Sequence, residues 1–403
     1  MKKYLFLFIV SFIIISCKNK QKKLRYNEKE IASLGLNDVK KTNINTDSIT
    51  RINLNSFIKD NSFNFGSLVE EIKFIPLETT NKSLLDNIRK IIVTNSNIFI
   101  HDDFKDGGIV IFDNYGKFIK RIENGKGPGE LLGLYDISFD ENENELIAYQ
   151  KSFLFFYNRF GEFIRYKKLP LGFHRFTTIK DGYILKTLGS HNSNAHLGDI
   201  RDNTLLITDK NFKIKTSALP YPVSNVNLEG KHYLHKNKSL HVTQKFTDTI
   251  YEYKDELQRL KASYVIDYSE KKLPRKYTLS TMNKFNDATK KNDYYFYLGE
   301  YLDTPSHHAF FLQNWYKKHI VTLFRDKKSG NIIGGTRAKF NSQELPPIAF
   351  PKFVSGDYFI STYLPKKDKL QNSTIISKND KIKIKNLKQT DNPTLVFFKL
   401  KKF

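Results

Sequence analysis

Histidines gather at three places in the chain, and neutral imidazole is the commonest protein ligand for metals. The groups are His191 with His196, then His232, His235 and His241, then His307 with His308. A zinc site needs side chains that converge on one point, usually with thiols or carboxylates. Lysines surround His232 and His235 and would repel a cation, and strand residues three apart point to opposite faces. We therefore assign no metal site to these histidines.

Two acidic stretches and one glycine-rich stretch are the next candidates for chemistry. Asp102-Asp103 and residues 140–145 (Asp-Glu-Asn-Glu-Asn-Glu) offer oxygens of the kind that bind calcium, but such runs are also typical of solvated hairpin turns. Residues 125–130 (Gly-Lys-Gly-Pro-Gly-Glu) lack the spacing and the final Lys-Ser/Thr of a phosphate-binding loop, and no helix is expected after them. We interpret all three as turns and expect no cofactor.

Catalytic groups are not evident in the sequence. No Gly-x-Ser-x-Gly nucleophile motif occurs. Acid–base catalysis would need two carboxylates, or a histidine and a carboxylate, that the fold brings together, and the sequence does not show which side chains meet. Tyr221, residues 294–297 and Trp315 could stack on sugar rings, but aromatic residues on strand-like segments also pack between elements.

Cys17 is the single cysteine and lies at the end of an apolar N-terminal run. Lys2 and Lys3 precede this run, and Ser16 directly precedes the cysteine. The run is shorter than the about 20 apolar residues that span a bilayer, so it predicts a secretory signal. Its end resembles the bacterial lipobox, in which the cysteine thiol accepts diacylglycerol before cleavage. We predict a signal peptide over residues 1–16 and lipidation at Cys17.

Residues 17–50 are polar and rich in Lys and Asn, which predicts a flexible tether. Lys18 rather than Asp follows the cysteine, so no signal for retention in the inner membrane is evident. The basic stretch from Lys18 to Lys23 also differs from the acidic stretch that directs some lipoproteins to the cell surface. We expect an anchor in the outer membrane that faces the periplasm.

The net charge of +24 comes from 66 basic and 42 acidic residues. Such an excess suits anionic lipid, acidic polysaccharide or nucleic acid as a partner. Most of the cations are lysines, however, whereas arginine is the usual reader of phosphates and base edges. Because the chain also carries an export signal, we expect no nucleic-acid partner.

From residue 51 to residue 403 one pattern of short apolar runs and polar turns continues throughout, and it predicts an all-β domain. Short runs rich in Ile, Phe, Tyr and Val alternate with Asp, Asn, Gly and Lys turns. Helical spacing occurs only over residues 276–290 and predicts at most one short helix. Examples of the strand-like runs are residues 90–93, 98–100, 109–112, 118–119 and 146–149.

An internal repeat indicates the architecture. Residues 111–119 (Ile-Phe-Asp-Asn-Tyr-Gly-Lys-Phe-Ile) return 45 positions later as residues 156–164 (Phe-Tyr-Asn-Arg-Phe-Gly-Glu-Phe-Ile), both as strand, Asx-x-aromatic-Gly turn and strand. A weaker copy spans residues 205–214, with Asn211 in the place of the glycine. Further copies are predicted at residues 250–257 and 322–333.

A repeat of 40 to 50 residues built from strands is typical of a β-propeller blade, and residues 51–403 fit six blades. A pair of β-sandwiches is the competing architecture. We expect residues near 66–78 to pair with the terminal strand, residues 394–402, and so to close the ring.

Four segments resemble a known family. Residues 71–80 (Glu-Ile-Lys-Phe-Ile-Pro-Leu-Glu-Thr-Thr), 125–130, 248–251 (Asp-Thr-Ile-Tyr) and 356–361 (Gly-Asp-Tyr-Phe-Ile-Ser) are similar to the six-bladed β-propeller lipoproteins of Bacteroidetes-type bacteria, with NHL-like blade repeats. The resemblance implies a fold and a compartment. It implies no reaction and no catalytic positions.

These features favour a lipid-anchored envelope propeller that acts as a binding or interaction module. Two alternatives stay open. The first is a carbohydrate-active enzyme of the glycan lyase or hydrolase type, with its site in the central channel. The second is an accessory component of an envelope nutrient-uptake system that contacts a partner protein.

Overall fold

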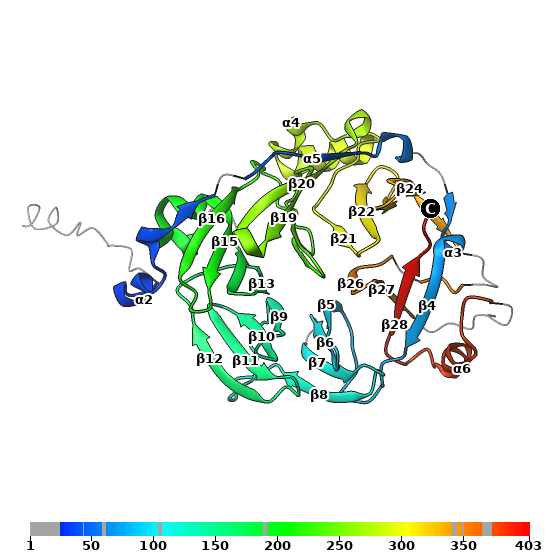
Figure 1. Ribbon diagram of the computed structural model, residues 1–403, viewed down its shortest axis with the longest axis horizontal. Coiled ribbons are helices and arrows are strands. Elements are labelled where there is room, and N and C mark those ends of the chain that lie inside the picture. The colour runs from blue at the N-terminus through cyan, green and yellow to red at the C-terminus, as the bar shows by residue number, and fades with distance from the viewer. Residues whose placement is uncertain are drawn as a thin grey trace, which may run out of the picture.

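Six small antiparallel sheets stand around one axis and form a six-bladed β-propeller (Figure 1). Each blade has four antiparallel strands, and its innermost strand faces the axis. The expected fold class is confirmed, and the pair of β-sandwiches is excluded. The structure is a computed structural model, which describes residues 25–42, 44–58, 62–103, 107–187, 192–340, 345–348, 350–364 and 373–403.

The first three blades follow one another along the chain, each with its innermost strand first. Blade 1 has β5 (Ile88–Val93), β6 (Asn97–Asp102), β7 (Gly108–Asp113) and β8 (Phe118–Glu123). Blade 2 has β9 (Asp136–Asp140), β10 (Glu145–Gln150), β11 (Phe153–Asn158) and β12 (Phe163–Lys168). Blade 3 has β13 (Arg175–Ile179), β14 (Gly182–Lys186), β15 (Asn203–Asp209) and β16 (Ile214–Pro220).

Blades 4 to 6 complete the ring. Blade 4 has β17 (Leu234–Lys236), β18 (Leu240–Val242), β19 (Thr249–Lys254) and β20 (Arg259–Asp267). Blade 5 has β21 (Tyr301–Asp303), β22 (His307–Asn314), β23 (His319–Asp326) and β24 (Ile332–Gly335). Blade 6 has β26 (Phe353–Ser355), β27 (Tyr358–Tyr363), β28 (Thr394–Leu400) and β4 (Val69–Ile75).

Blade 6 closes the ring by pairing the two ends of the propeller sequence. β28 pairs antiparallel with β27 on one side and with β4 on the other, in a register that places Val396 opposite Phe74. Both side chains are fully buried. The predicted pairing of residues near 66–78 with the C-terminal strand is confirmed, and it leaves no open gap between the first and last blades.

The predicted repeats are the outer hairpins of the blades, each joining the third strand to the fourth. In the first copy, Asp113 Oδ1 accepts the backbone N–H groups of Tyr115 and Lys117 at 2.9 Å, and Gly116 takes a positive φ of 87°. In the weaker copy Phe212, not Asn211, holds the positive φ, at 68°. The expectation for Asn211 was wrong because Phe212 gains a stacked contact with Tyr183, at 4.2 Å between ring centroids, which offsets the backbone strain.

The chain before the blades differs from the expected tether over residues 25–50. From Tyr26 on, this segment runs along the outside of blades 3 and 4 (Figure 1). β1 (Lys40–Lys41) adds to β16 in parallel, and β2 (Thr50–Asn53) adds to β20 in parallel. Two unpaired sheet edges and a set of apolar side chains hold the segment in place. We call residues 25–58 the N-terminal strap; Cys17 and the rest of residues 1–24 lie outside the described residues.

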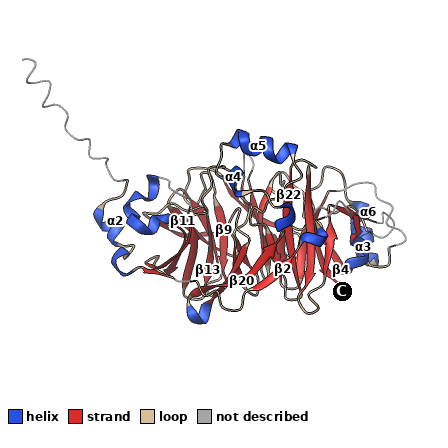
Figure 2. Ribbon diagram, turned by 90° about the horizontal axis from the view of Figure 1, so that it is seen from above, coloured by secondary structure: helices blue, strands red, loops and turns tan. Residues whose placement is uncertain are grey.

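Short helices cover parts of the ring. α4 (Arg275–Thr278) and α5 (Met282–Lys291) lie over one face of the propeller (Figure 2). They correspond to the predicted helix, which Thr281 divides because its side chain accepts the Lys284 N–H and caps α5. In the described part of the chain no helix is long and apolar enough to cross a membrane. The other helices are α2 (Glu28–Ala32), α3 (Phe65–Leu68) and α6 (Lys378–Asn386), with 3-10 turns η1 (Leu36–Asp38), η2 (Asn55–Phe57), η3 (Asn192–Asp202), η4 (Asp255–Leu257) and η5 (Ser269–Lys271).

The hydrophobic core lies between neighbouring blades, where the faces of adjacent sheets meet. Between blades 1 and 2, Phe99 stacks on Phe139 with ring centroids 5.2 Å apart. The strand β25 (Arg337–Lys339) follows blade 5 in the chain and pairs in parallel with β3 (Ser62–Asn64). In the chain, β3 directly precedes α3 and β4, and β4 is the outermost strand of blade 6. This core packs the blades around the axis, and their innermost strands form the wall of the site described next.

Candidate functional site

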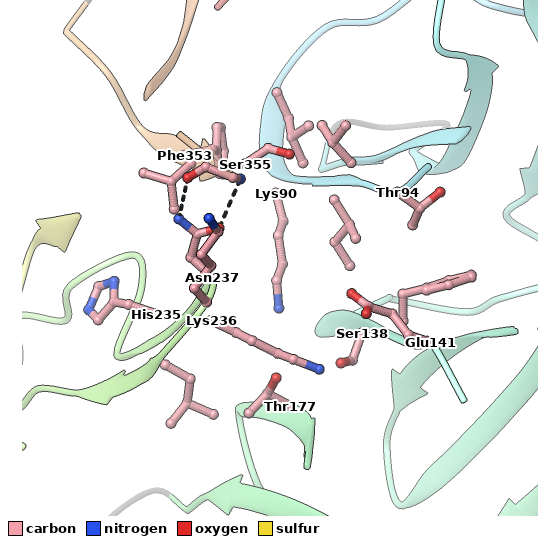
Figure 3. Close-up of a pocket in the computed structure, with 18 of the residues that line it drawn as sticks. Lys90, Thr94, Ser138, Glu141, Thr177, His235, Lys236, Asn237, Phe353 and Ser355 are labelled. Atoms are coloured by element: carbon pink, nitrogen blue, oxygen red, sulfur yellow. Dashed lines mark hydrogen bonds between the residues drawn. The ribbon is translucent and has the colours of Figure 1, made fainter. Parts of the chain in front are cut away.

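A cavity of about 930 Å³ lies on the propeller axis, and we call it the central channel. Figure 3 shows its side chains converging from several inner strands. Every blade contributes to its lining, so the ring must close before the cavity exists. One lining residue from each blade, in order, is Lys90, Ser138, Thr177, Lys236, Leu302 and Phe353.

The hairpins between the first and second strands of the blades form one mouth of the channel. Asn237, at the tip of the β17–β18 hairpin, links three blades. Its Nδ2 donates to the Asp303 carbonyl oxygen at 2.9 Å. Its Nδ2 also donates to the Gly356 carbonyl oxygen at 2.8 Å, and its Oδ1 accepts the Gly356 N–H at 2.9 Å (Figure 3). These contacts fix the rim of the mouth on the side of blades 4 to 6.

A buried ion pair holds the opposite wall. Lys90 Nζ lies 2.9 Å from Asp136 Oδ1 and also donates to the Ile137 carbonyl oxygen at 2.7 Å. The second carboxylate oxygen of Asp136 accepts the Phe176 N–H of blade 3 at 2.9 Å. Asp136 thereby connects blades 1, 2 and 3, and the positive charge of Lys90 is compensated inside the protein.

Of the other cations in the channel, Lys238 lies 3.5 Å from Asp357 Oδ1, whereas Lys236 and Lys352 lack such compensation. Lys236 Nζ donates to the hydroxyl oxygen of Thr178 at 2.9 Å, and burial lowers the pKa of Lys236 and of Lys352 from the ordinary lysine value. Both lysines keep contact with solvent, and within the described part of the chain neither forms an ion pair, although the carboxylates of Glu141 and Asp140 partly offset the lowered pKa of Lys236. Glu141 is the one carboxylate among the described residues of the lining, against Lys90, Arg159, Lys236, Lys238 and Lys352. The channel therefore has an excess of positive charge.

Two of the predicted histidines border the channel, but they are buried and uncharged. Burial lowers the pKa of His235 to about 3 and holds that of His232 well below the usual value. His235 Nε2 lies 3.0 Å from the Thr243 hydroxyl, and the His232 ring packs edge-on against Phe353. Because His232 lies before β17 rather than on it, the expectation of opposite strand faces does not apply, and both side chains line the channel.

The remaining histidines are spread over the fold. His196 Nε2 donates to the Pro170 carbonyl oxygen. His241 and His308 flank Asp303 in blades 4 and 5, while His307 contacts the Lys401 carbonyl oxygen. Among the described residues, no group of three His, Cys, Asp or Glu side chains is arranged to hold a metal ion. His191 lies outside the described residues.

The acidic and glycine-rich stretches have structural partners. Asp102 Oδ1 accepts the Asn87 N–H at 2.9 Å, and Asp103 pairs with Arg89 at 2.6 Å. In the β9–β10 hairpin, Asp140 Oδ1 accepts the Asn142 N–H at 3.0 Å. Residues 125–130 connect blade 1 to blade 2 and are followed by β9, not by a helix. These contacts agree with the interpretation of residues 140–145 and 125–130 as turns, whereas Asp102 is the buried last residue of β6.

The aromatic candidates are mostly core residues. Tyr295 and Tyr297 are fully buried, and Trp315 packs edge-on against Phe285 and Phe296 beneath α5. Tyr221 is the exception, because it lines a second cavity. The sequence offered no signal for the channel lysines, since each stands alone in a different repeat and only the closed ring brings them together.

Comparison with known proteins places the chain in a family without an assigned activity. Residues 49–399 match the family described as "Domain of unknown function (DUF4934)". The chain belongs to this family. No curated protein matches the sequence.

A solved structure from Bacteroides fragilis supports the fold. A Bacteroides fragilis protein titled "Putative exported protein" has a TM-score of 0.72 and 19% identity, and the match covers 88% of this chain and 100% of that chain. The structure titled U3-55K matches 81% of this chain and 98% of its own, with 8% identity and a TM-score of 0.40. At these identities the likeness concerns the fold.

Proposed function

We propose that this protein is an envelope binding module whose central channel takes an anionic ligand. The excess of cationic over acidic side chains in the described lining of the channel is the observation that carries the proposal. An ammonium group that loses water on burial gains from a nearby negative charge. Lys236 and Lys352 form no ion pair among the described residues, although Glu141 and Asp140 act on Lys236 from farther away, so a ligand with carboxylate, sulfate or phosphate groups would supply a direct partner.

The size and make-up of the channel fit a ligand rather than solvent alone. Its volume of about 930 Å³ falls within the range of pockets for small organic molecules, which is about 300 to 1,000 Å³. Ser138, Thr177 and Asn237 supply hydrogen-bonding groups around the lysines. Phe139 and Phe353 add apolar surface, so the channel suits an organic anion such as a segment of an acidic oligosaccharide.

A titration calorimetry experiment tests this proposal with four probes. They are tetragalacturonate, a heparin tetrasaccharide, tripolyphosphate and neutral maltotetraose. At least one of the three anions should bind the full-length protein, more weakly as salt is raised, while maltotetraose should not bind. The double variant Lys236→Met with Lys352→Met should lose at least tenfold in affinity, and Lys210→Met, on the outer β15–β16 turn, should bind like the wild type. Binding of maltotetraose alone, or no loss in the double variant, would contradict the proposal.

Binding is favoured over hydrolysis by the same lining. Glycoside hydrolases of the common type use two carboxylates that flank the bond to be cleaved. Among the described lining residues the channel has one, Glu141. Chromatography of tetragalacturonate and of the heparin tetrasaccharide after prolonged incubation should show both intact, and cleavage products would establish the alternative of a hydrolase or lyase.

The proposal includes a lipid anchor at Cys17 and NHL-like blades in a Bacteroidetes-type lipoprotein. Support comes from the basic and apolar N-terminal pattern that ends at Ser16-Cys17, and from the Bacteroides fragilis protein titled as exported. The anchor would lie in the outer membrane, facing the periplasm. Intact-mass analysis should find the mature chain beginning at a diacylated Cys17, and Cys17→Ser should remain unprocessed. An unmodified cysteine in the mature chain would contradict the anchor.

Contact with a partner protein of an uptake system is a second candidate function, and an exposed aromatic groove favours it. Phe153, Phe155, Phe163 and Tyr166 line a cavity of about 490 Å³ on the outside of blade 2. A photo-crosslinking residue in place of Tyr166, which is 62% exposed, should yield a discrete adduct with one envelope protein in cells. The same residue in place of Leu257, 55% exposed on blade 4, should not. Equal adducts at both positions would argue against this function.

A further inference from the structure

A second cavity, of about 800 Å³, lies beside blade 3, and we call it the side cavity. The connection from blade 3 to blade 4 separates it from the central channel. Along this connection Tyr233 lines the side cavity, whereas its neighbours His232 and Leu234 line the channel. The side cavity is therefore a separate site, and nothing argued for the channel depends on it.

Lys186, at the end of β14, is the unusual residue of the side cavity. Its side chain is 7% exposed, and its Nζ lies 4.5 Å from the centroid of the Tyr233 ring. Within the described part of the chain, no carboxylate lies at ion-pair distance from this ammonium group. Burial lowers the pKa of Lys186 to about 8, and the carboxylate of Glu229 opposes this only in part. A buried cation that contacts an aromatic ring but has no ion-pair partner is costly for the fold, so its presence calls for a reason.

Glu229, the carboxylate of this cavity that acts on Lys186, already has two other partners. Glu229 Oε1 pairs with Lys245 Nζ at 2.6 Å, and Glu229 Oε2 accepts the Tyr233 hydroxyl at 2.9 Å. Arg175 adds positive charge at the edge, although its Nε and Nη1 donate to backbone carbonyl oxygens. The charged and titratable groups around Lys186 are His174, Arg175, Asp202, Tyr221, Glu229, Tyr233 and Lys245.

The rest of the wall combines aromatic faces with hydrogen-bonding groups. The Tyr221 hydroxyl lies 2.6 Å from that of Thr187, which itself donates to the Asn203 carbonyl oxygen, so Tyr221 is the donor. Gln244 donates to the Thr204 hydroxyl at 2.8 Å. Flat apolar rings beside hydroxyl and amide groups suit a ligand that has both C–H faces and hydroxyl groups.

We propose that the side cavity binds a small sugar acid, whose carboxylate pairs with the Lys186 ammonium group and whose ring lies between Tyr221 and Tyr233. The volume admits a monosaccharide or a disaccharide. A carboxylate at Lys186 would form a charge-assisted hydrogen bond where water is largely excluded, which is where such bonds are strongest. The inference does not rest on the function proposed for the channel.

Titration calorimetry with D-glucuronate and with D-glucose tests the inference on the full chain. Glucuronate should bind at least tenfold more tightly than glucose at pH 7. Its affinity should fall between pH 7 and pH 9.5, because Lys186 loses its charge as the pH rises through the pKa of about 8. Burial raises the pKa of Tyr221 and Tyr233, so these hydroxyls stay protonated over this range.

Variants locate the bound carboxylate. Lys186→Met should abolish the preference for glucuronate and the pH dependence, while its melting temperature stays equal or rises because a buried charge is removed. Lys186→Arg should retain part of the preference. The channel double variant Lys236→Met with Lys352→Met should bind glucuronate like the wild type. Equal binding of glucose, undiminished binding by Lys186→Met, or loss of binding only in the channel double variant would each overturn the inference.

Discussion

Buried histidines are the residue-scale feature that gives the fold a pH dependence. Burial is the main cause that lowers the pKa of His101 and of His308 to about 4, and that of His235 to about 3. Each ring is therefore neutral in the folded protein near neutral pH. In the unfolded chain the same rings titrate near pH 6.5. The sequence showed His235 and His308 in clusters, but only the packing within blades 1, 4 and 5 reveals that His101, His235 and His308 are held uncharged.

We expect the free energy of unfolding to fall as the pH drops from about 6.5 to 4. In this range the unfolded chain takes up protons that the folded chain does not, which lowers stability by about 1 kcal/mol per histidine at pH 5.5. Urea unfolding at pH 7.5, 6.5, 5.5 and 4.5 measures the effect. His101→Leu should make the slope shallower, and a flat profile for the wild type would show that these histidines are not buried.

The ion pair of Lys90 and Asp136 supports a second prediction at this scale. Asp136→Ala should lower the free energy of unfolding by about 3 to 5 kcal/mol, because it leaves Lys90 buried without its counter-charge and Phe176 N–H without its acceptor. Glu143→Ala is the matched control, since its pair with Lys210 is exposed on both sides and should contribute less than about 1 kcal/mol. Similar urea midpoints for the two variants would speak against the role of Asp136.

At the scale of elements, the blade hairpins were predictable because each carries a local sequence signal. The N-terminal strap carries no such signal and was not predicted. The Asx-x-aromatic-Gly turn is encoded within a few residues, so the hairpins at residues 111–119 and 156–164 stood out. Ring closure followed from the apolar runs near residues 69–75 and 394–400. The strap buries only scattered residues among polar ones, which leaves no period to read. Its buried apolar residues are Tyr26, Leu34, Ile52, Leu54 and Ile58.

The strap should contribute to stability. Leu54 is fully buried against blade 4 and blade 5, so Leu54→Ala should cost about 2 to 5 kcal/mol in the free energy of unfolding. Leu257→Ala, at an exposed turn of blade 4, should change it by less than about 0.5 kcal/mol. If both variants unfolded at the wild-type urea concentration, residues 50–58 would indeed be a loose tether.

Removal of the closing strand should have a larger effect. Deletion of residues 394–403 takes away β28, so β27 and β4 both lose their partner and the ring opens. We expect the melting temperature to fall by on the order of 10 °C or more. Deletion of residues 402–403 alone is the control and should have a small effect. An unchanged melting curve after the longer deletion would mean that the ring is not closed here.

At the scale of the whole molecule, the site is a product of ring closure. Lys90, Lys236 and Lys352 belong to blades 1, 4 and 6 and lie far apart in the chain, yet all three line the central channel. The sequence predicted the ring of blades but not which side chains line the central channel, because each of these lysines resembles the many others of a basic chain. What distinguishes the channel lysines is their position on innermost strands, or directly before one for Lys352, and the scarcity of carboxylates in the described lining.

The most direct test of the central claim is to locate a bound anion on the axis. A crystal of the full-length protein soaked in selenate, and measured at the selenium absorption edge, would show tetrahedral anions by their anomalous signal. The account predicts a peak inside the central channel within hydrogen-bond distance of Lys236 Nζ and Lys352 Nζ, which disappears in the double variant Lys236→Met with Lys352→Met. Peaks only at lysines outside the channel, with none on the axis, would contradict it.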